Sequence, residues 1–243
     1  MLVHSLAVWT LLRKRGCQPL YLAGHSLGEY SALAAADGLA FADAVRLVHQ
    51  RGLFMQEAVP VGRGSMAAML GMERQTVEAL CAEFAAGGVL QPANYNAPGQ
   101  IVVAGETALV QAAVQAAKER QLGRTRLLNV SAPFHCAMLQ SAADRLRAAF
   151  AAVTLQPLTI PVLSNVTAEP HVSPQDMKTL LIRQVCAPVR WEESMQYAVT
   201  QGCDTLLEVG PGSVLGGLMR RIAPQVAIGS LDDILGRSDR EGA

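Results

Sequence analysis

One serine of this sequence lies in a setting that suits a nucleophile. Ser26 stands in Gly24-His25-Ser26-Leu27-Gly28, after the apolar residues 20–22 and before a helical pattern that begins at Glu29. A strand that turns sharply into a helix leaves such a hydroxyl exposed at the tip of the turn, and the glycines allow close approach there. The first N–H groups of the helix then point to where an oxyanion would form. A glycine-rich turn with a structural serine has the same letters, but the strand and helix around it favour a nucleophile.

A general base for this serine has to come from elsewhere in the chain. His25 is adjacent to Ser26, where successive side chains diverge, so we expect it to support the turn. His49 lies within a predicted helix and His171 in a polar loop. His135 lies in a loop between a predicted strand and a predicted helix, where α/β folds place catalytic groups. A locally hydrogen-bonded residue at a helix start is the alternative, and spacing alone does not decide.

Arg51 could bind a carboxylate. A guanidinium group offers two parallel hydrogen bonds to a carboxylate, which an enzyme acting on a dicarboxylic half-thioester would need. On the sequence alone, however, a solvated surface arginine is the favoured interpretation of Arg51.

The elements that would position these residues follow two different patterns of secondary structure along the chain. Residues 62–130 give the order β-α-β-β-α-β, the split βαβ or ferredoxin-like pattern, with strands at 65–70, 89–94, 100–104 and 125–130 and helices at 76–86 and 107–121. On either side of this segment, strands alternate with helices, which indicates a mainly parallel sheet. The predicted strands are at 20–22, 160–164 and 205–209, and the predicted helices at 41–59, 138–152, 176–185 and 214–222.

We therefore expect an α/β protein in which a subdomain is inserted into a core. The core comprises residues 1–61 and 131–235, the ferredoxin-like subdomain residues 62–130, and a frayed polar tail residues 236–243. A helix from residue 2 to about Gly16 opens the chain.

Composition excludes several classes of function. Lys plus Arg and Asp plus Glu each number 20, which argues against nucleic-acid binding. The apolar run of residues 2–12 is too short to span a bilayer. The five cysteines form no C-x-x-C pair and no cluster with histidine, so we expect free thiols, no metal site and a reducing, cytoplasmic compartment.

Taken together, these residues make the chain resemble the malonyl-CoA:acyl-carrier-protein transacylases of bacterial fatty-acid synthesis and the acyltransferase domains of polyketide synthases. The resemblance runs from the first helix to about Leu235 and rests on five stretches: Ala23 to Leu33, Arg51-Gly52 with Met55-Gln56, Asn94 to Gln100, Ser131 to Cys136, and Glu208 to Gly212. It implies an α/β-hydrolase-like core.

The resemblance also implies a role for particular residues. Ser26 matches the nucleophile, His135 the base and Arg51 the group that holds the malonyl carboxylate. The carbonyl of Gln184 would orient the histidine, and the backbone N–H of Leu27 would donate to the oxyanion. Pocket-lining positions correspond to His25, Met55, Asn94, Asn96 and Phe134, and the bulk of Phe134 resembles the malonyl-selective members.

The implied reaction is a two-step transfer. A malonyl group would pass from malonyl-CoA to Ser26 and then to the phosphopantetheine thiol of acyl carrier protein, without metal or organic cofactor. We expect a monomer that docks the acidic carrier on a basic rim, with Arg124, Arg126, Arg220 and Arg221 as candidates, although ordinary surface charge explains any one of them.

Three alternatives remain open from the sequence. A polyketide-type acyltransferase shares all of these residues, whereas a serine esterase or thioesterase shares Ser26 and His135 but has no use for Arg51. The third is an inactive remnant, because we find no counterpart of the strand and Gly-Gln-Gly-Ser-Gln-type loop with which the family begins. We therefore expect an N-terminally truncated core that lacks the second oxyanion donor of that loop.

Overall fold

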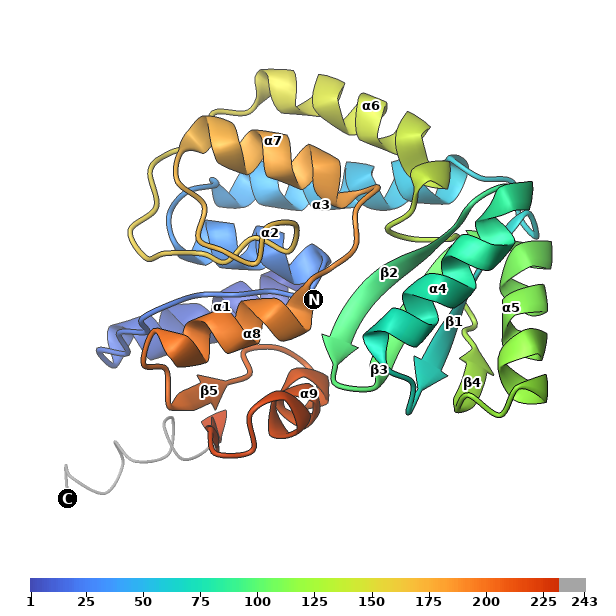
Figure 1. The fold of residues 1–243 in the computed structure, drawn as a ribbon. Coiled ribbons are helices and arrows are strands. Elements are labelled where there is room, and N and C mark those ends of the chain that lie inside the picture. The colour runs from blue at the N-terminus through green and yellow to red at the C-terminus, as the bar shows by residue number, and fades with distance from the viewer. Residues whose placement is uncertain (232–243) are drawn as a thin grey trace.

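The chain folds into a helix-rich part and a smaller part built on one sheet, as the computed structural model of residues 1–231 shows (Figure 1). The helix-rich part contains α1 (Leu2–Lys14), α2 (Leu27–Ala35), α3 (Phe41–Glu57), α6 (Gln140–Ala149), α7 (Pro174–Gln184), α8 (Trp191–Thr200) and α9 (Val214–Ile222), with strands β5 (Thr205–Leu207) and β6 (Ala227–Gly229). The tail expected at 236–243 lies outside the described residues.

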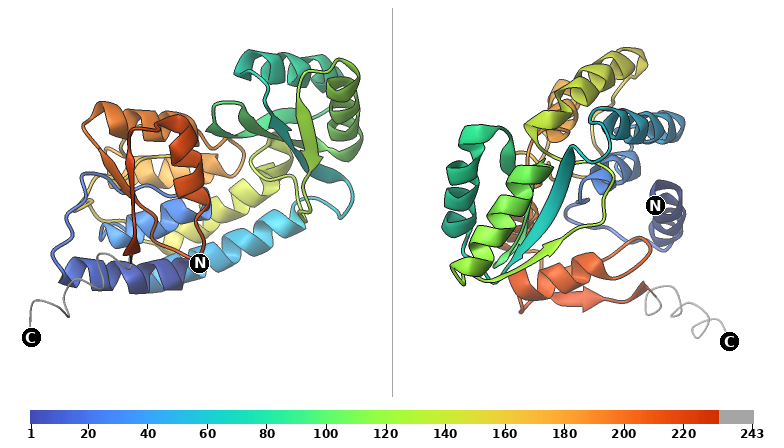
Figure 2. Two further views of the ribbon diagram at one scale, coloured as in Figure 1. Left: turned by 90° about the horizontal axis from the view of Figure 1, so that it is seen from below. Right: turned by 90° about the vertical axis from the view of Figure 1, so that its right-hand side faces the viewer.

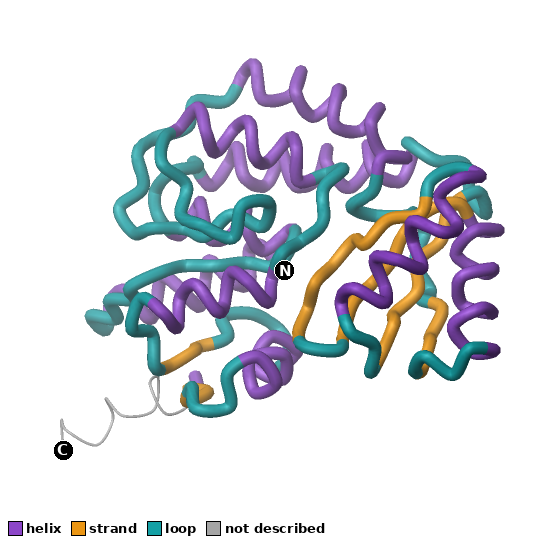
Figure 3. The backbone as a smooth tube through the Cα atoms, viewed as in Figure 1, coloured by secondary structure: helices purple, strands orange, loops and turns teal. Residues whose placement is uncertain are grey.

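The smaller part is formed by the segment between α3 and α6. Its elements are β1 (Gly64–Leu70), α4 (Arg74–Phe84), β2 (Leu90–Ala97), β3 (Gln100–Glu106), α5 (Thr107–Glu119) and β4 (Arg124–Leu127). The strands pair antiparallel in the order β2-β3-β1-β4. Figure 3 shows that most strand residues of the molecule lie in this sheet.

Alternation along the strands gives this sheet two buried faces. Ala67 and Met69 of β1 pack with α4 and α5, which cover one face. Met66, on the opposite face of the same strand, packs in a cluster with Cys136 of the helix-rich part. Because successive side chains of a strand point to opposite faces, the same strand both builds the small part and packs against the loop that carries His135.

Strand β2 also joins the two parts through the backbone. The N–H of Tyr95 donates to the carbonyl of Val189 at 2.9 Å, and the N–H of Val189 donates to the carbonyl of Ala93 at 2.9 Å. This parallel bridge holds the end of β2 beside the segment that leads into α8 (Figure 2).

The core of the helix-rich part is a cluster shared by α2, α3, α6 and α7. Its fully buried members include Leu33 of α2, Leu47 of α3, Leu146 of α6 and Leu181 of α7. A second cluster, around Trp191, packs α8 against α9. No helix within residues 1–231 is both long and apolar enough to cross a membrane.

Two predicted core strands are wrong as regular strands. Residues 20–22 and 160–164 meet only in one parallel bridge, between Leu22 and Val162. Leu20, expected to be buried, is 59% exposed. Pro161 has no N–H to give to a ladder, which limits the pairing, and within the described core the regular parallel pairing is that of β5 with β6.

Other elements differ in their bounds or were not predicted. The helix expected at 138–152 consists of a 3-10 turn at Ala137–Leu139, α6, and a second 3-10 turn at Phe150–Ala152. Strand β4 ends at Leu127, since the N–H of Val130 turns back to the carbonyl of Leu128. Helix α8 and strand β6 had no counterpart in the sequence-based prediction.

Candidate active site

The turn at Ser26 is strained and tightly packed. Ser26 precedes α2 with φ 54° and ψ −105°, a backbone conformation that is unusual for a residue other than glycine. A Cβ atom placed on Gly24 would lie 1.9 Å from the carbonyl carbon of Gly28. Only glycine therefore fits at position 24, and this close contact forces the sharp turn on which the Ser26 side chain stands.

Asn165 holds the turn from both sides. Its Oδ1 accepts a 2.7 Å hydrogen bond from the N–H of Ser26, and its Nδ2 donates a 2.8 Å hydrogen bond to the carbonyl of Gly24. Asn165 is 1% exposed. Sequence reasoning missed this residue, because it follows the predicted strand 160–164 in a segment with no recognisable motif, far along the chain from Ser26.

Ser26 and His135 form a hydrogen-bonded pair. The distance from Ser26 Oγ to His135 Nε2 is 2.7 Å, and His135 Nδ1 lies 2.8 Å from the backbone carbonyl of Gln184. A carbonyl oxygen only accepts, so Nδ1 carries the proton and Nε2 is left to accept the proton of the serine hydroxyl. The structure thus brings together three of the residues that the resemblance implies.

His135 is neutral in this environment. It is 4% exposed, and its backbone has φ 62°. Burial, and less strongly the nearby charge of Arg51, together lower the pKa of His135 to about 3. The hydrogen bond to Gln184 acts in the opposite direction but is the weaker influence.

Arg51 is buried beside this pair. The surface position that the residue pattern favours is wrong, because Arg51 is 6% exposed and lies on the inner side of α3. Its Nη2 donates to Ser26 Oγ at 2.9 Å and to Gln184 Oε1 at 3.0 Å. Burial lowers the pKa of Arg51, and attraction to Tyr30 and Glu29 opposes that shift.

A buried cation needs a compensating partner. Within residues 1–231 no carboxylate forms an ion pair with Arg51, and its buried Nε has no hydrogen-bond partner. The arrangement therefore suits a carboxylate supplied by a bound molecule, placed within reach of the Ser26 hydroxyl.

The predicted pocket residues differ in their contacts. His25 Nε2 lies 2.8 Å from Asn96 Oδ1, and burial lowers the pKa of His25. Asn94 is buried on β2, two positions before Asn96. Met55 and Phe134 pack in the helical core cluster. A role of these five residues in substrate binding stays a prediction.

Leu27 is the first residue of α2, so its N–H has no acceptor within the helix. That is the position required of an oxyanion donor next to Ser26. The N–H of Ser26 itself is engaged by Asn165, so it does not serve this purpose.

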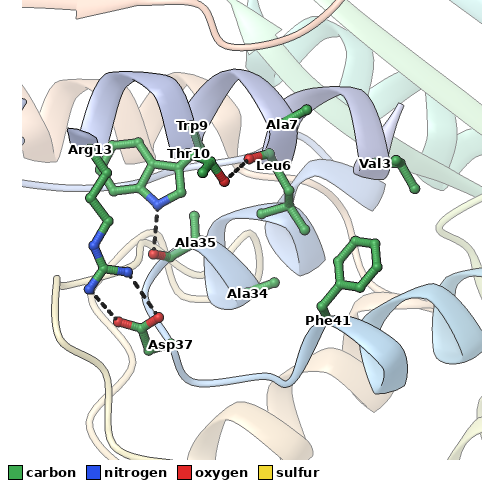
Figure 4. A pocket seen from close by; sticks show the side chains of 10 residues that line it. All are labelled: Val3, Leu6, Ala7, Trp9, Thr10, Arg13, Ala34, Ala35, Asp37 and Phe41. Atoms are coloured by element: carbon green, nitrogen blue, oxygen red, sulfur yellow. Dashed lines mark hydrogen bonds and ion pairs between the residues drawn. The ribbon is translucent and has the colours of Figure 1, made fainter. Parts of the chain in front are cut away.

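A cavity of about 440 Å³ lies away from these residues, between α1, α2 and the start of α3. Figure 4 shows its lining, with Arg13 paired to Asp37 at one end and the indole N–H of Trp9 donating to the carbonyl of Ala35. None of the predicted site residues lines it. Within residues 1–231, no group of three or more His, Cys, Asp or Glu side chains is arranged to hold a metal ion.

The candidate basic residues are distributed over both parts. Arg124 and Arg126 are exposed on β4, and Arg220 is exposed on α9. Arg221 instead donates to Gln100 Oε1 at 2.8 Å and to the carbonyl of Pro98 at 2.9 Å, and so fastens α9 to the turn between β2 and β3.

Comparisons with known proteins identify the family to which the chain is similar. The sequence pattern of the acyl transferase domain matches residues 1–243. The malonyl CoA-acyl carrier protein transacylase of Escherichia coli (strain K12) is 43% identical over 234 residues, which are 96% of this chain and 76% of that protein.

Solved structures show the same fold. The malonyl CoA-acyl carrier protein transacylase of Coxiella burnetii superimposes with a TM-score of 0.94 at 38% identity, over 98% of this chain and 77% of that one. A complex of a type II PKS acyl-carrier protein with its malonyl-transacylase gives a TM-score of 0.93 at 39% identity, over 98% and 79% of the two chains. The predicted α/β class is thereby confirmed.

Proposed function

This chain belongs to the acyl transferase family of malonyl CoA-acyl carrier protein transacylases, and we propose on that premise that it moves a malonyl group from malonyl-CoA to acyl carrier protein through an ester on Ser26. The observation that carries the proposal is the convergence of three side chains. Ser26 Oγ lies 2.7 Å from a neutral histidine nitrogen and 2.9 Å from a buried guanidinium nitrogen.

The first step is acylation of Ser26. His135 Nε2 accepts the hydroxyl proton as Oγ attacks the thioester carbonyl carbon, and the oxyanion that forms is stabilised by the N–H of Leu27. The carbon–sulfur bond then breaks. Coenzyme A leaves as a thiol with the proton from His135, and a malonyl-serine ester remains.

The second step reverses these roles. His135 takes the proton of the phosphopantetheine thiol, whose sulfur attacks the ester carbonyl, and Ser26 leaves with that proton. Throughout both steps, the Gln184 carbonyl keeps the proton of His135 on Nδ1. The proposed steps need neither a metal nor an organic cofactor.

Arg51 gives the reaction its preference for malonyl. A bound malonyl carboxylate would form an ion pair with the buried guanidinium group of Arg51 through charge-assisted hydrogen bonds. It would also offset the positive charge that lowers the pKa of His135, so the correct substrate strengthens the base that it needs. An acyl group without a carboxylate leaves both groups as they are in the resting protein.

The chain is proposed to act in fatty-acid synthesis in the cytoplasm, as a monomer. In support, all five cysteines are free thiols, as expected in a reducing compartment. The oligomeric state is checked by size-exclusion chromatography with light scattering at the concentration used for assays.

Mass spectrometry after brief mixing with malonyl-CoA tests the proposal. We expect a malonyl adduct on the peptide that contains Ser26, its absence in Ser26→Ala, and transfer of the group to holo acyl carrier protein. Release of free malonate at the same rate without carrier would indicate a thioesterase instead. A well-folded protein with no adduct would indicate an inactive acyltransferase relative.

A further inference from the structure

Glu29 is a fully buried carboxylate that the proposed steps do not use. It is 0% exposed, in the first turn of α2. Its oxygens accept hydrogen bonds from Gln184 Nε2 at 2.6 Å, from His171 Nε2 at 2.8 Å and from the N–H of Asn165 at 3.2 Å. His171, expected in a polar loop, is thus buried as well. A carboxylate is buried at high cost unless such donors surround it, and a helix N-terminus favours it further.

The side chain of Gln184 connects this carboxylate to Arg51. Its Nε2 faces Glu29, and its Oε1 accepts from Arg51 Nη2 at 3.0 Å. The orientation of the amide is unambiguous, because a carboxylate only accepts hydrogen bonds and a guanidinium group only donates them. One carboxamide therefore lies between a buried anion and a buried cation, with its dipole aligned to both.

This spacing matters for the chemistry of Arg51. A direct ion pair with Glu29 would balance the charge of Arg51 and occupy its donors, so that Arg51 would bind a further carboxylate less strongly. With the amide between them, Glu29 stabilises the buried cation, yet the cation keeps donors for another anion. The same amide N–H₂ donates to the backbone carbonyl of Ser26 at 3.0 Å, which places the guanidinium group and the nucleophile on one rigid support.

We propose that Glu29 is a positioning residue that, through the carboxamide of Gln184, aims Arg51 and thereby sets the preference for acyl groups that carry a carboxylate. The inference rests on the proposed malonyl transfer. It assigns a selectivity role to a residue that touches neither the substrate nor the reacting atoms.

The test is Glu29→Gln, which keeps the size of the side chain and an acceptor for Gln184 Nε2 but removes the charge. Acylation of Ser26 is followed with malonyl-CoA and with acetyl-CoA, and KM and kcat are separated for each. We expect KM for malonyl-CoA to rise roughly tenfold while both constants for acetyl-CoA stay within about twofold. A merely structural role would lower the acylation rate with both donors alike, and that result would overturn the proposal.

A matched control and a double-mutant cycle sharpen the result. Glu208→Gln removes another carboxylate that accepts from backbone N–H groups, at the start of α9, and we expect wild-type ratios from it. If Glu29 acts through Arg51, Glu29→Gln in an Arg51→Ala background changes the malonyl-to-acetyl ratio no further. An additive effect in the double variant contradicts the proposal.

Gln184→Ala tests the connection from its other end, should Glu29→Gln fail to fold by circular dichroism. It removes the carboxamide but keeps the backbone carbonyl that orients His135. A fall in the malonyl-to-acetyl ratio supports the proposal, and an unchanged ratio overturns it. Absence of a malonyl-Ser26 ester in the wild-type protein would refute the proposed function itself, whereas an ester with unaltered ratios in these variants refutes only the role of Glu29.

Discussion

The backbone carbonyl of Gln184 accepts a 2.8 Å hydrogen bond from Nδ1 of His135. A neutral carbonyl here replaces the carboxylate that a serine hydrolase triad places behind its histidine. It fixes the tautomer but adds no negative charge to stabilise an imidazolium. The base is therefore weak, which suits attack on thioesters and disfavours attack on less reactive acyl compounds.

The weak base predicts an unusual pH profile. Because burial and Arg51 lower the pKa of His135 to about 3, the imidazole stays neutral well below its ordinary titration range. We expect kcat/KM for malonyl-CoA, measured by rapid quench of Ser26 acylation, to be flat from about pH 8 down to about pH 5. A fall in kcat/KM with an apparent pKa near 6.5, the ordinary value for histidine, would show that the pKa of His135 is not lowered.

The same shift makes folding stability depend on pH. The unfolded chain binds a proton at His135 below about pH 6.5, whereas the folded chain does so only near pH 3, so stability rises with pH between these values. From pH 6.5 down to pH 5 this group alone is expected to cost about 2 kcal/mol of unfolding free energy.

Urea unfolding at several pH values measures this dependence. The variant His135→Gln removes the titrating group, so its stability should fall less steeply over the same interval, whatever its absolute stability. Equal slopes for the two proteins would mean that other groups, such as the buried His25, account for the loss.

Removal of Arg51 should separate binding of the carboxylate from the acyl chemistry. Arg51→Ala is expected to lower kcat/KM for malonyl-CoA by roughly 10²-fold, since charge-assisted hydrogen bonds contribute about 1.5–3 kcal/mol each. Arg46, on the exposed side of the same helix and paired with Asp43, provides the control Arg46→Ala, with wild-type kinetics expected. A similar loss in both variants would point to damage to α3 rather than to a lost carboxylate partner.

A site residue could be predicted from the sequence where the residues that it contacts are close to it along the chain. The turn around Ser26 was recognisable because its glycines, strand and helix are contiguous. Arg51 was not recognisable as buried from its own neighbours, since α3 alone does not show which side packs inward. Asn165 and His171 act on the turn across long stretches of chain, and no spacing rule connects them to it.

The fold shows the same division. Residues 62–130 gave a clear pattern because strands and helices follow one another at short distances along the chain, although β4 is mostly exposed. The segments 20–22 and 160–164 were overpredicted, because a short run of mostly apolar residues suggests a strand whether or not a neighbouring strand completes the ladder. Their single bridge nevertheless suffices to place Ser26, since Asn165 follows directly and fixes the turn with two side-chain hydrogen bonds.

Replacement by alanine is expected to have opposite effects on stability at the two glycines of the nucleophile turn, Gly24 and Gly28. Gly24→Ala introduces a Cβ that would overlap the backbone of Gly28 at 1.9 Å, so either the turn opens or α2 shifts. We expect a stability loss of several kcal/mol, in the range of severe overpacking, and no Ser26 ester. Gly28→Ala meets nothing within 4 Å and lies inside α2, where alanine is the better helix former by up to about 1 kcal/mol. We therefore expect Gly28→Ala to unfold at an equal or higher temperature than the wild type. Thermal unfolding of the two variants side by side decides the matter, because equal destabilisation would mean that a backbone contact between positions 24 and 28 does not build the turn.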